Sequence, residues 1–361
     1  MKFKLTLLVT LALLAGCDQL TNFKAKEFAV LDIFYTGPTV YVRSLAAEDA
    51  TNTLWVGTSL GLNEVDLTSH EVRNTFNRDS GLANEYVFGI GIDDDGYKWF
   101  GTNAGGMTRY KEGAEEEWRT FFPLHGLADY WIYTFANHPD GSLWVGTWAG
   151  ANRVDRNTLE MTTYVEELVN EWVYGLDVDD KGNVWFGTEG GVSKFDGKNW
   201  QHWTHEDGMG AKNENALPFS TNTGLGTRAR HDLGILNAGQ ETYNPNYVFS
   251  LIVAKDQSVW TGTWGGGAAH LEDGKWTNYT TDDGLAGNIV YSVIQARDGS
   301  FWFGTNHGIS RFDGDNWISF RSTPGQTGTD VYTLTEAPNG EIWAGVRGGV
   351  LRLGEKSQVE N

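Results

Sequence analysis

The sequence is poor in cysteine, proline and basic residues. Its 361 residues include one cysteine and seven prolines, and only 27 lysines and arginines stand against 47 aspartates and glutamates. A single cysteine excludes a disulfide within the chain. The formal net charge of −20 disfavours binding to nucleic acid or to anionic lipid headgroups. We therefore expect an acidic surface and no nucleic-acid partner.

The N-terminus carries the features of an export signal. Lys2 and Lys4 precede a mostly apolar stretch, and Leu14–Ala15–Gly16–Cys17 resembles a bacterial lipobox. We predict that residues 1–16 are a lipoprotein signal peptide, that Cys17 is lipidated and that residues 17–27 form a tether. The alternative is an ordinary secretory signal with a coincidental cysteine. The prediction places the protein in the bacterial cell envelope, on the periplasmic side of either membrane or at the cell surface, with the lipid as its only membrane contact.

Tryptophan, in contrast, is abundant and periodic. The phrase Trp-x-Gly-Thr, or a close variant, begins at Trp55, Trp99, Trp144, Trp185, Trp260, Trp302 and Trp343. Successive differences between these positions are 44, 45, 41, 75, 42 and 41 residues. A period in the low forties with short β-rich units is typical of propeller blades, each a four-stranded sheet. We predict an all-β fold with a single seven-bladed β-propeller over residues 28–354 and a polar tail at 355–361.

The seventh repeat ends too early to supply a fourth strand. Only a polar tail follows Leu353, whereas an unpaired strand-like run, Phe28–Tyr35, precedes the first repeat. We predict that this run is the outer strand of blade seven. Such closure would join the two ends of the chain and remove an exposed sheet edge.

The repeats resemble a known family. Gly81–Phe88 and Gly96–Thr102 look like the two-component regulator propeller repeat, which builds the periplasmic sensor halves of bacterial hybrid sensor kinases. The resemblance covers roughly Val40 to Leu353. It implies a ligand-binding, sensor-type module that has a sensor kinase or another envelope protein as partner. Unlike the large sensors, the chain shows one propeller and no kinase segment.

Positions whose chemistry changes from blade to blade are candidates for ligand contact, because positions that fold the blade should keep one character. The position eleven residues before the repeat tryptophan is aromatic from Phe88 to Tyr332 and fits a folding role. Positions thirteen residues before and four residues after that tryptophan vary, and blade topology places both on one face. The aromatic crescent comprises Tyr86, Trp131, Trp148, Trp172, Tyr247 and Trp264, and the polar arc comprises Asn306, Asp330 and Arg347. We predict that they form a ligand-binding rim. The alternative is that the rings pack between blades or under loops.

An insertion separates blades four and five. Trp200 and Tyr247 are 47 residues apart, whereas the corresponding distance in three other blades is 13. The extra segment, about residues 207–244, belongs on the same face as the crescent. Loops of this length are usually functional lids or disordered insertions. Its basic residues are Arg228, Arg230 and His231, which would meet either an anionic ligand group or the acids of the propeller itself.

Signals for metal binding are weak. The segment Asp177–Gly182 resembles half of a calcium loop but lacks the distal glutamate, and a hairpin turn explains its residues. His202 and His205 lie on opposite faces of a presumed outer strand, which argues against a joint metal site. We expect no cofactor, with calcium as a minor alternative.

Signals for catalysis are equally weak. The sequence contains no phosphate loop, serine-nucleophile elbow or zinc motif. His307 is the one candidate for acid/base chemistry of the kind used by propeller lyases such as streptogramin lyase, and the sequence shows no partner for it. We therefore expect a binding protein without catalytic residues. The preferred hypothesis is an envelope lipoprotein that binds a small organic ligand such as a glycan fragment. The alternatives are a protein-interaction scaffold in an envelope complex and a lyase-like enzyme.

Overall fold

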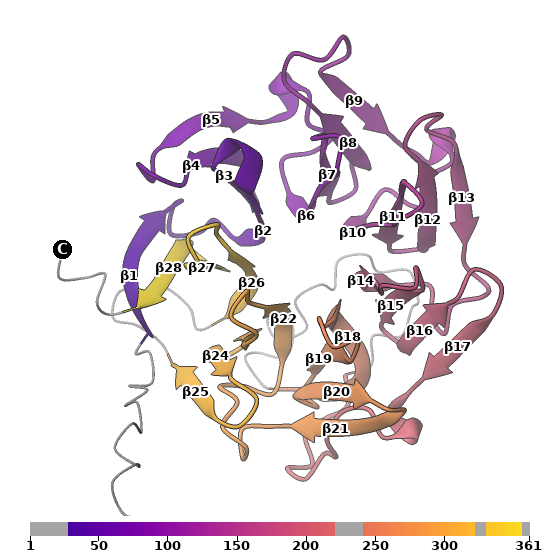
Figure 1. Cartoon of the computed structure of the whole chain (residues 1–361), viewed down its shortest axis with the longest axis vertical. Coiled ribbons are helices and arrows are strands. Elements are labelled where there is room, and N and C mark those ends of the chain that lie inside the picture. The colour runs from indigo at the N-terminus through magenta and orange to yellow at the C-terminus, as the bar shows by residue number, and fades with distance from the viewer. Residues whose placement is uncertain (1–27, 221–240, 322–329, 356–361) are drawn as a thin grey trace, which may run out of the picture.

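Seven antiparallel sheets of four strands each surround a central axis in the computed structural model, which describes residues 28–220, 241–321 and 330–355 (Figure 1). The first strand of each sheet lies at the axis and the last lies at the rim. This arrangement confirms the predicted seven-bladed β-propeller. Within the described ranges, the loops contain four short 3-10 helices: η1 (Asp49–Thr51), η2 (Arg78–Ser80), η3 (Pro123–His125) and η4 (His205–Asp207).

The strands follow the repeats. Blade one contains β2 (Val42–Glu48), β3 (Thr53–Thr58), β4 (Gly61–Asp66) and β5 (Val72–Phe76). Blade two contains β6 (Val87–Ile92), β7 (Lys98–Thr102), β8 (Met107–Tyr110) and β9 (Trp118–Phe121). Blade three contains β10 (Ile132–Asn137), β11 (Ser142–Thr147), β12 (Gly150–Asp155) and β13 (Met161–Tyr164). Blade four contains β14 (Val173–Val178), β15 (Val184–Thr188), β16 (Gly191–Phe195) and β17 (Trp200–Trp203).

The remaining blades repeat this order. Blade five contains β18 (Asn244–Val253), β19 (Val259–Trp264), β20 (Ala268–Glu272) and β21 (Lys275–Tyr279). Blade six contains β22 (Val290–Gln295), β23 (Phe301–Thr305), β24 (Gly308–Phe312) and β25 (Trp317–Phe320). Blade seven contains β26 (Val331–Glu336), β27 (Ile342–Val346), β28 (Gly349–Glu355) and β1 (Phe28–Tyr35).

Blade seven takes its outer strand from the start of the described chain. β1 pairs antiparallel with β28, from Phe28 opposite Glu355 to Tyr35 opposite Gly349. Figure 1 shows the indigo and yellow ends of the chain side by side in this blade. Phe28 also packs edge-on against Trp302 of blade six, with ring centroids 5.1 Å apart. The two ends of the described chain therefore stabilise one sheet together.

Each residue of the repeated phrase has a separate packing role. The tryptophan is buried between neighbouring sheets; Trp99, for example, is fully buried in a cluster with side chains of blade three. The glycine permits close approach, because a Cβ at Gly101 would lie 2.8 Å from Ile132 of the next inner strand. The threonine closes the following turn, since the Thr102 hydroxyl donates to the Gly106 carbonyl at 2.8 Å. The phrase thus encodes the contact between one blade and the next.

The described ends of the insertion pack on blade five. The Tyr243 hydroxyl donates to the Ala211 carbonyl at 2.7 Å, and the Trp264 indole N–H donates to the Thr242 hydroxyl at 2.8 Å. Residues 221–240 lie outside the described residues, so the predictions for Arg228, Arg230 and His231 are not addressed. The same holds for the signal peptide, for Cys17 and for the tether. No helix within the described ranges is long and apolar enough to cross a membrane.

Candidate ligand-binding site

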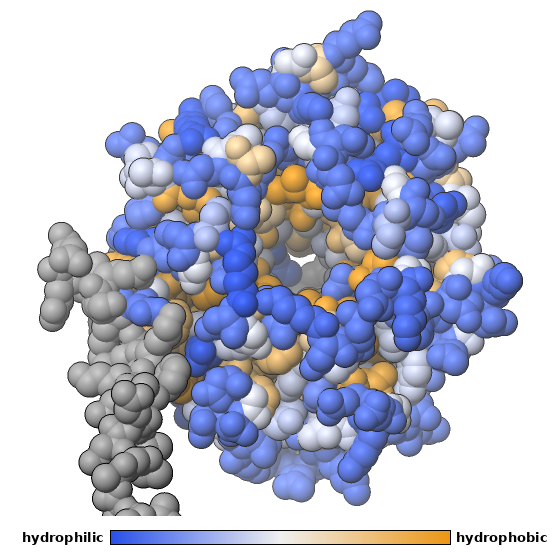
Figure 2. Space-filling view, viewed as in Figure 1, coloured by the Kyte–Doolittle hydropathy of each residue, from blue (hydrophilic) through white to orange (hydrophobic). Residues whose placement is uncertain are grey.

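A channel runs along the propeller axis. Figure 2 shows it as an opening at the centre of the molecule, with hydrophobic residues around it. The cavity inside it has a volume of about 230 Å³ and is lined by residues of all seven inner strands. Inner strands run along the axis of a propeller, so each contributes one residue to every layer of the channel wall.

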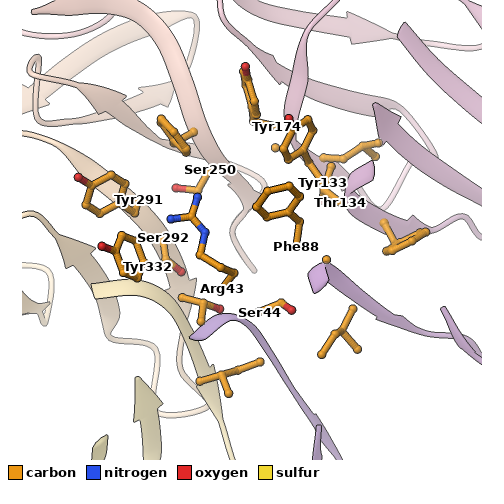
Figure 3. Close-up of a pocket in the computed structure, with 18 of the residues that line it drawn as sticks. Arg43, Ser44, Phe88, Tyr133, Thr134, Tyr174, Ser250, Tyr291, Ser292 and Tyr332 are labelled. Atoms are coloured by element: carbon orange, nitrogen blue, oxygen red, sulfur yellow. The ribbon is translucent and has the colours of Figure 1, made fainter. Parts of the chain in front are cut away.

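One layer of the wall is a closed ring of seven side chains (Figure 3). Its members are Arg43, Phe88, Tyr133, Tyr174, Phe249, Tyr291 and Tyr332. Neighbouring aromatic centroids around the ring are 5.3, 4.8, 5.4, 5.6 and 5.4 Å apart, in chain order. The Arg43 guanidinium carbon closes the ring, at 4.6 Å from the Tyr332 centroid and 5.6 Å from the Phe88 centroid.

The sequence does not reveal this ring as a site, because its recurrent aromatic position fits a role in blade folding. Blade one carries Arg43 at this position instead of an aromatic residue, and this exception could have drawn attention to the ring. The exception is hard to find in the sequence because the hairpin between the first and second strands of blade one is one residue longer than that of blade two. Ala46 pairs with Trp55, nine residues later, whereas Gly91 pairs with Trp99, eight residues later. A fixed count back from the tryptophan therefore misses Arg43 by one residue.

The layer next to the ring consists of small residues. They are Ser44, Gly89, Thr134, Gly175, Ser250, Ser292 and Thr333. At Gly89 a Cβ would lie 2.5 Å from the Tyr133 carbonyl oxygen, so a larger residue there would displace the neighbouring strand. The Ser250 hydroxyl is buried and has no hydrogen-bond partner among the described residues. These small side chains keep the channel open beside the ring.

Five of the six crescent residues gather in one cluster, which packs against the ring. Trp131 and Trp148 have centroids 5.2 Å apart, Trp148 and Trp172 are 4.9 Å apart, and Tyr247 and Trp264 are 5.7 Å apart. Tyr86 lies 4.6 Å from Phe88 of the ring. The crescent therefore packs against the ring. We call the face that carries the connections between the fourth and first strands the crescent face.

Burial divides the crescent into two groups. The exposed fractions of Trp148, Trp172, Tyr247 and Trp264 are 7%, 5%, 2% and 3%, whereas Tyr86 and Trp131 are half-buried. The four buried rings use their faces mainly for contact with other rings. The side chains that present aromatic surface toward the solvent are therefore Tyr86 and Trp131.

The three residues of the polar arc contact different neighbours. The Asn306 amide donates to Glu241 Oε1 at 2.9 Å, and Asp330 Oδ1 accepts a hydrogen bond from the Tyr291 hydroxyl at 3.1 Å. The Arg347 guanidinium lies 5.4 Å from the Tyr41 ring centroid. Asp330 thereby connects the polar arc to the ring.

Burial keeps two phenols of the ring, those of Tyr133 and Tyr174, in their neutral form. It raises the pKa values of the Tyr133 and Tyr174 hydroxyls, and that of Tyr247 beside them, well above the ordinary value of a tyrosine. A neutral phenol donates one hydrogen bond and also accepts. The channel wall therefore combines flat apolar faces with hydroxyl groups, and its ring contributes one cation.

The calcium-like segment is a hairpin turn. Asp179 accepts hydrogen bonds from the Asn183 amide at 2.7 Å and from the Trp185 indole N–H at 3.1 Å. His202 contacts the Ser193 hydroxyl at 3.0 Å, and His205 Nδ1 contacts the Met209 carbonyl at 2.7 Å. No group of three or more histidine, cysteine, aspartate or glutamate side chains within the described ranges is arranged to hold a metal ion.

His307 has a carboxylate partner that the sequence did not reveal. Its Nε2 lies 2.7 Å from Glu241 Oε1, although the two residues are 66 positions apart. Both side chains are about half exposed and border a second cavity of about 510 Å³, whose lining includes Asn215, Asn288 and Arg321. A carboxylate can orient a histidine for proton transfer, so this pair is the candidate for acid/base chemistry.

The comparison with known families identifies the repeat. The profile of the two-component regulator propeller matches residues 126–149 and 284–307. The chain contains two-component regulator propeller repeats. No curated protein sequence matches it.

Solved structures share the architecture of this chain. The extracellular domain of a hybrid two-component system from B. thetaiotaomicron has a TM-score of 0.70 and 18% identity, covering 93% of this chain and 42% of that one. A second such domain has a TM-score of 0.63 and 17% identity, covering 91% and 39%. This chain therefore spans about two fifths of the length of these structures. A catalytically inactive histidine variant of virginiamycin B lyase from Staphylococcus aureus, with quinupristin, has a TM-score of 0.66 and 12% identity over 91% and 99%. At these identities the likeness establishes the fold of the chain and leaves its ligand open.

Proposed function

We propose that this chain is a sensor-type propeller of the bacterial cell envelope that binds a small organic ligand at the crescent end of its channel. The proposal is supported by contact of the aromatic ring, which lines the channel, with the crescent on one side and with Asp330 of the polar arc. Large apolar surfaces with a few fixed polar groups are typical of ligand sites. The propeller repeat and the likeness to extracellular domains of two-component systems support a sensor role.

The volume of the channel limits the size of the ligand that it can enclose. Its volume of about 230 Å³ is below the roughly 300–1,000 Å³ of sites that enclose a drug-sized ligand. A ligand as large as a glycan fragment would therefore place one end in the channel and the rest against Tyr86 and Trp131. An apolar sugar face suits a tryptophan ring, and the hydroxyl groups of a sugar suit the phenols and the polar arc.

The lipobox supports the proposed location. A lipid on Cys17, followed by the tether at 17–27, would hold the propeller at a membrane surface without a spanning segment. A sensor also needs a recipient for its signal, and we propose a sensor kinase or another envelope protein in that role. Substituting serine for Cys17 should release the protein from membrane fractions. Retention of the Cys17→Ser variant at the membrane would contradict lipid anchoring.

Ligand binding is tested first with the soluble form that begins at Asp18. Thermal shift and tryptophan fluorescence are measured against oligosaccharides, aromatic acids, amino acids and calcium, because a ligand that binds only the folded state raises its stability. We expect a saturable response that disappears in the double variant Trp131→Ala, Trp172→Ala. The control is Trp317→Ala, on the outer strand of blade six, which should retain binding. Unchanged binding in the double variant would exclude the crescent as the site.

Two alternatives have their own tests. A protein-interaction scaffold should purify with a stoichiometric partner that is lost when residues 207–244 are deleted. The pair of His307 and Glu241 favours an enzyme as the second candidate. In that case the ligand should be converted to a product detectable by mass spectrometry, and both His307→Ala and Glu241→Gln should slow the conversion.

A further inference from the structure

We propose that the second cavity, beside blades five and six on the crescent face, binds a small zwitterion. Arg321 holds the carboxylate of this ligand and Glu241 holds its ammonium group. The cavity shares no lining residue with the channel, so the inference does not depend on the ligand proposed for the channel. It also does not require that the bound molecule be converted to a product.

The cavity is built where several segments of the chain meet. Two of its lining residues belong to the described ends of the insertion, two to the connection between β21 and β22, and one follows β25; they are Asn215, Glu241, Thr281, Asn288 and Arg321. The volume of about 510 Å³ falls within the roughly 300–1,000 Å³ of small-molecule sites. The cavity is therefore large enough to hold an amino acid.

Arg321 differs from most arginines of the described chain. Those arginines pair with a carboxylate, as Arg352 does with Glu341 at 2.6 Å. Arg321 makes no ion pair within the described ranges, and its Nη2 lies 3.5 Å from the Leu285 carbonyl oxygen. Most of its planar fork of N–H donors is therefore available to the two oxygens of a carboxylate.

Glu241 supplies the opposite charge on the wall of the same cavity. Its Oε1 accepts hydrogen bonds from His307 Nε2 at 2.7 Å and from the Asn306 amide at 2.9 Å. An ionised carboxylate can only accept, so Nε2 carries the proton, and a neutral His307 leaves the negative charge on Glu241. Glu241 Oε2 has no hydrogen-bond partner among the described residues. This oxygen can accept from an ammonium group.

Asn288 adds a donor whose orientation is fixed. Its backbone carbonyl accepts from the N–H groups of Gly265 and Gly267 at 3.0 and 2.9 Å, and its side-chain oxygen accepts from the Thr281 N–H at 2.9 Å. The amide N–H donors of Asn288 have no partner in the described part of the chain. They can bind a carboxylate oxygen.

The two charges determine the ligand class. A ligand with one charge would match either Arg321 or Glu241, whereas an amine–carboxylate matches both. Ala286 is the one apolar residue of the cavity lining, which otherwise consists of polar side chains. This composition favours a small polar amino acid or a related zwitterion, in contrast to the aromatic wall of the channel.

The first test compares zwitterions with analogues that carry one charge. Binding to the full chain in detergent is measured at neutral pH by titration calorimetry. Glycine, β-alanine and 4-aminobutyrate place the two charges at increasing separations. Their analogues are acetate and methylamine, propionate and ethylamine, and butyrate and butylamine. We expect at least one zwitterion to bind at least about tenfold more tightly than both of its analogues, because only the zwitterion makes both charge-assisted contacts. If no zwitterion shows this preference, the proposed ligand class is wrong.

The second test locates the site. In Arg321→Gln the zwitterion should bind no more tightly than the amine, and in Glu241→Gln no more tightly than the carboxylate. If Arg321→Gln fails to fold, the reversed charge of Arg321→Glu must make butylamine bind more tightly than butyrate. The control is Arg78→Gln, an arginine of η2 between blades one and two, which should retain the preference. An unchanged preference in the variants of Arg321 and Glu241 would overturn the assignment.

The same probes separate this cavity from the channel. The double variant Trp131→Ala, Trp172→Ala should bind the zwitterion as the wild type does. Arg321→Gln should retain the binding of any ligand that depends on those two tryptophans. Loss of zwitterion binding in the double variant would place the zwitterion in the channel, and it would reject the present inference while supporting the proposed function.

Discussion

The two faces of the propeller use their repeated positions differently. On the face with the hairpins between first and second strands, the hairpin face, an acid holds the repeat tryptophan in several blades. Asp93 accepts from the Trp99 indole at 2.8 Å, and Glu48 accepts from the Trp55 indole at 2.9 Å. On the crescent face, the position four residues after the repeat tryptophan carries serine, tryptophan, glutamate, asparagine or arginine. The acid contact recurs in blades one, two and four, whereas the indole N–H groups of Trp144, Trp260 and Trp343 have no hydrogen-bond partner among the described residues. What all seven copies share is burial of the tryptophan, which indicates a scaffold role, and variation on the crescent face indicates freedom to bind.

The positions of the channel ring share features with both faces. Six of its seven positions are aromatic and contact one another, so they stabilise the inner strands as a scaffold would. The same side chains also line the cavity. A position that is aromatic in most blades can therefore serve packing and also line a cavity.

The largest expected effect is the loss of stability on removing a buried repeat tryptophan, compared with the loss on removing a half-buried tryptophan of the crescent. Trp99→Ala should lower the free energy of unfolding by about 3–5 kcal/mol, because it leaves a cavity between blades two and three. Trp131→Ala should cost less, about 1–2 kcal/mol, since its ring is already partly solvated. Urea denaturation followed by circular dichroism measures both. Equal losses would show that the crescent is as much scaffold as the repeat tryptophans are.

The next largest loss of stability is expected on breaking a buried ion pair on the hairpin face. Lys98 Nζ lies 2.8 Å from Glu48 Oε1 and joins blades two and one, with both side chains largely buried. Lys98→Met should cost about 3 kcal/mol, because it leaves a carboxylate buried without its cation. Adding Glu48→Gln should recover part of the loss in the same denaturation assay. The exposed pair of Arg119 and Glu116 is the control, and Arg119→Met should change stability little.

The raised pKa of Asp177 predicts that the stability of the protein depends on pH. Burial raises its pKa to about 6, with a further increase from nearby Asp179, against the effect of hydrogen bonds from the backbone of Val253 and Val178. An unfolded aspartate titrates near pH 4. The folded state therefore binds this proton more tightly, and the associated stability is full below about pH 4 and lost as the pH rises through 6.

The variant Asp177→Asn isolates that contribution. From pH 4 to pH 7, the stability of the wild type relative to the variant should fall by about 2–3 kcal/mol. Guanidinium denaturation at a series of pH values measures the difference. A difference that stays constant over this range would contradict the raised pKa.

The smallest expected effect concerns the exposed part of the hairpin face. Arg297 donates to the carbonyls of Ala337 and Pro338 and to Asp49, at 3.2, 2.7 and 2.8 Å, and so joins blades six, seven and one. Its side chain is half exposed, so Arg297→Ala should cost less than about 1 kcal/mol. A thermal midpoint measured at low and high salt would show the effect. A loss as large as that of Lys98→Met would mean that ring closure depends on this surface contact.

Much of the architecture was predictable because each repeat encodes its own contacts. The tryptophan, glycine and threonine of the phrase act within one blade and against the next, so their spacing indicates the number of blades and their order. The crescent was only partly predictable. Counting positions located Trp131 and Trp172 near the channel mouth, but it could not distinguish a half-buried ring from one that is 5% exposed.

By itself the sequence determined the propeller, the number of its blades, the place of the insertion and the acidic character of the surface, because these follow from local periodicity and composition. Only the tertiary structure decided which residues meet across the chain. Arg43 reaches Tyr332 from the opposite end of the sequence, and His307 reaches Glu241 across 66 positions. Such meetings depend on how seven sheets close around one axis, and no single repeat contains that information.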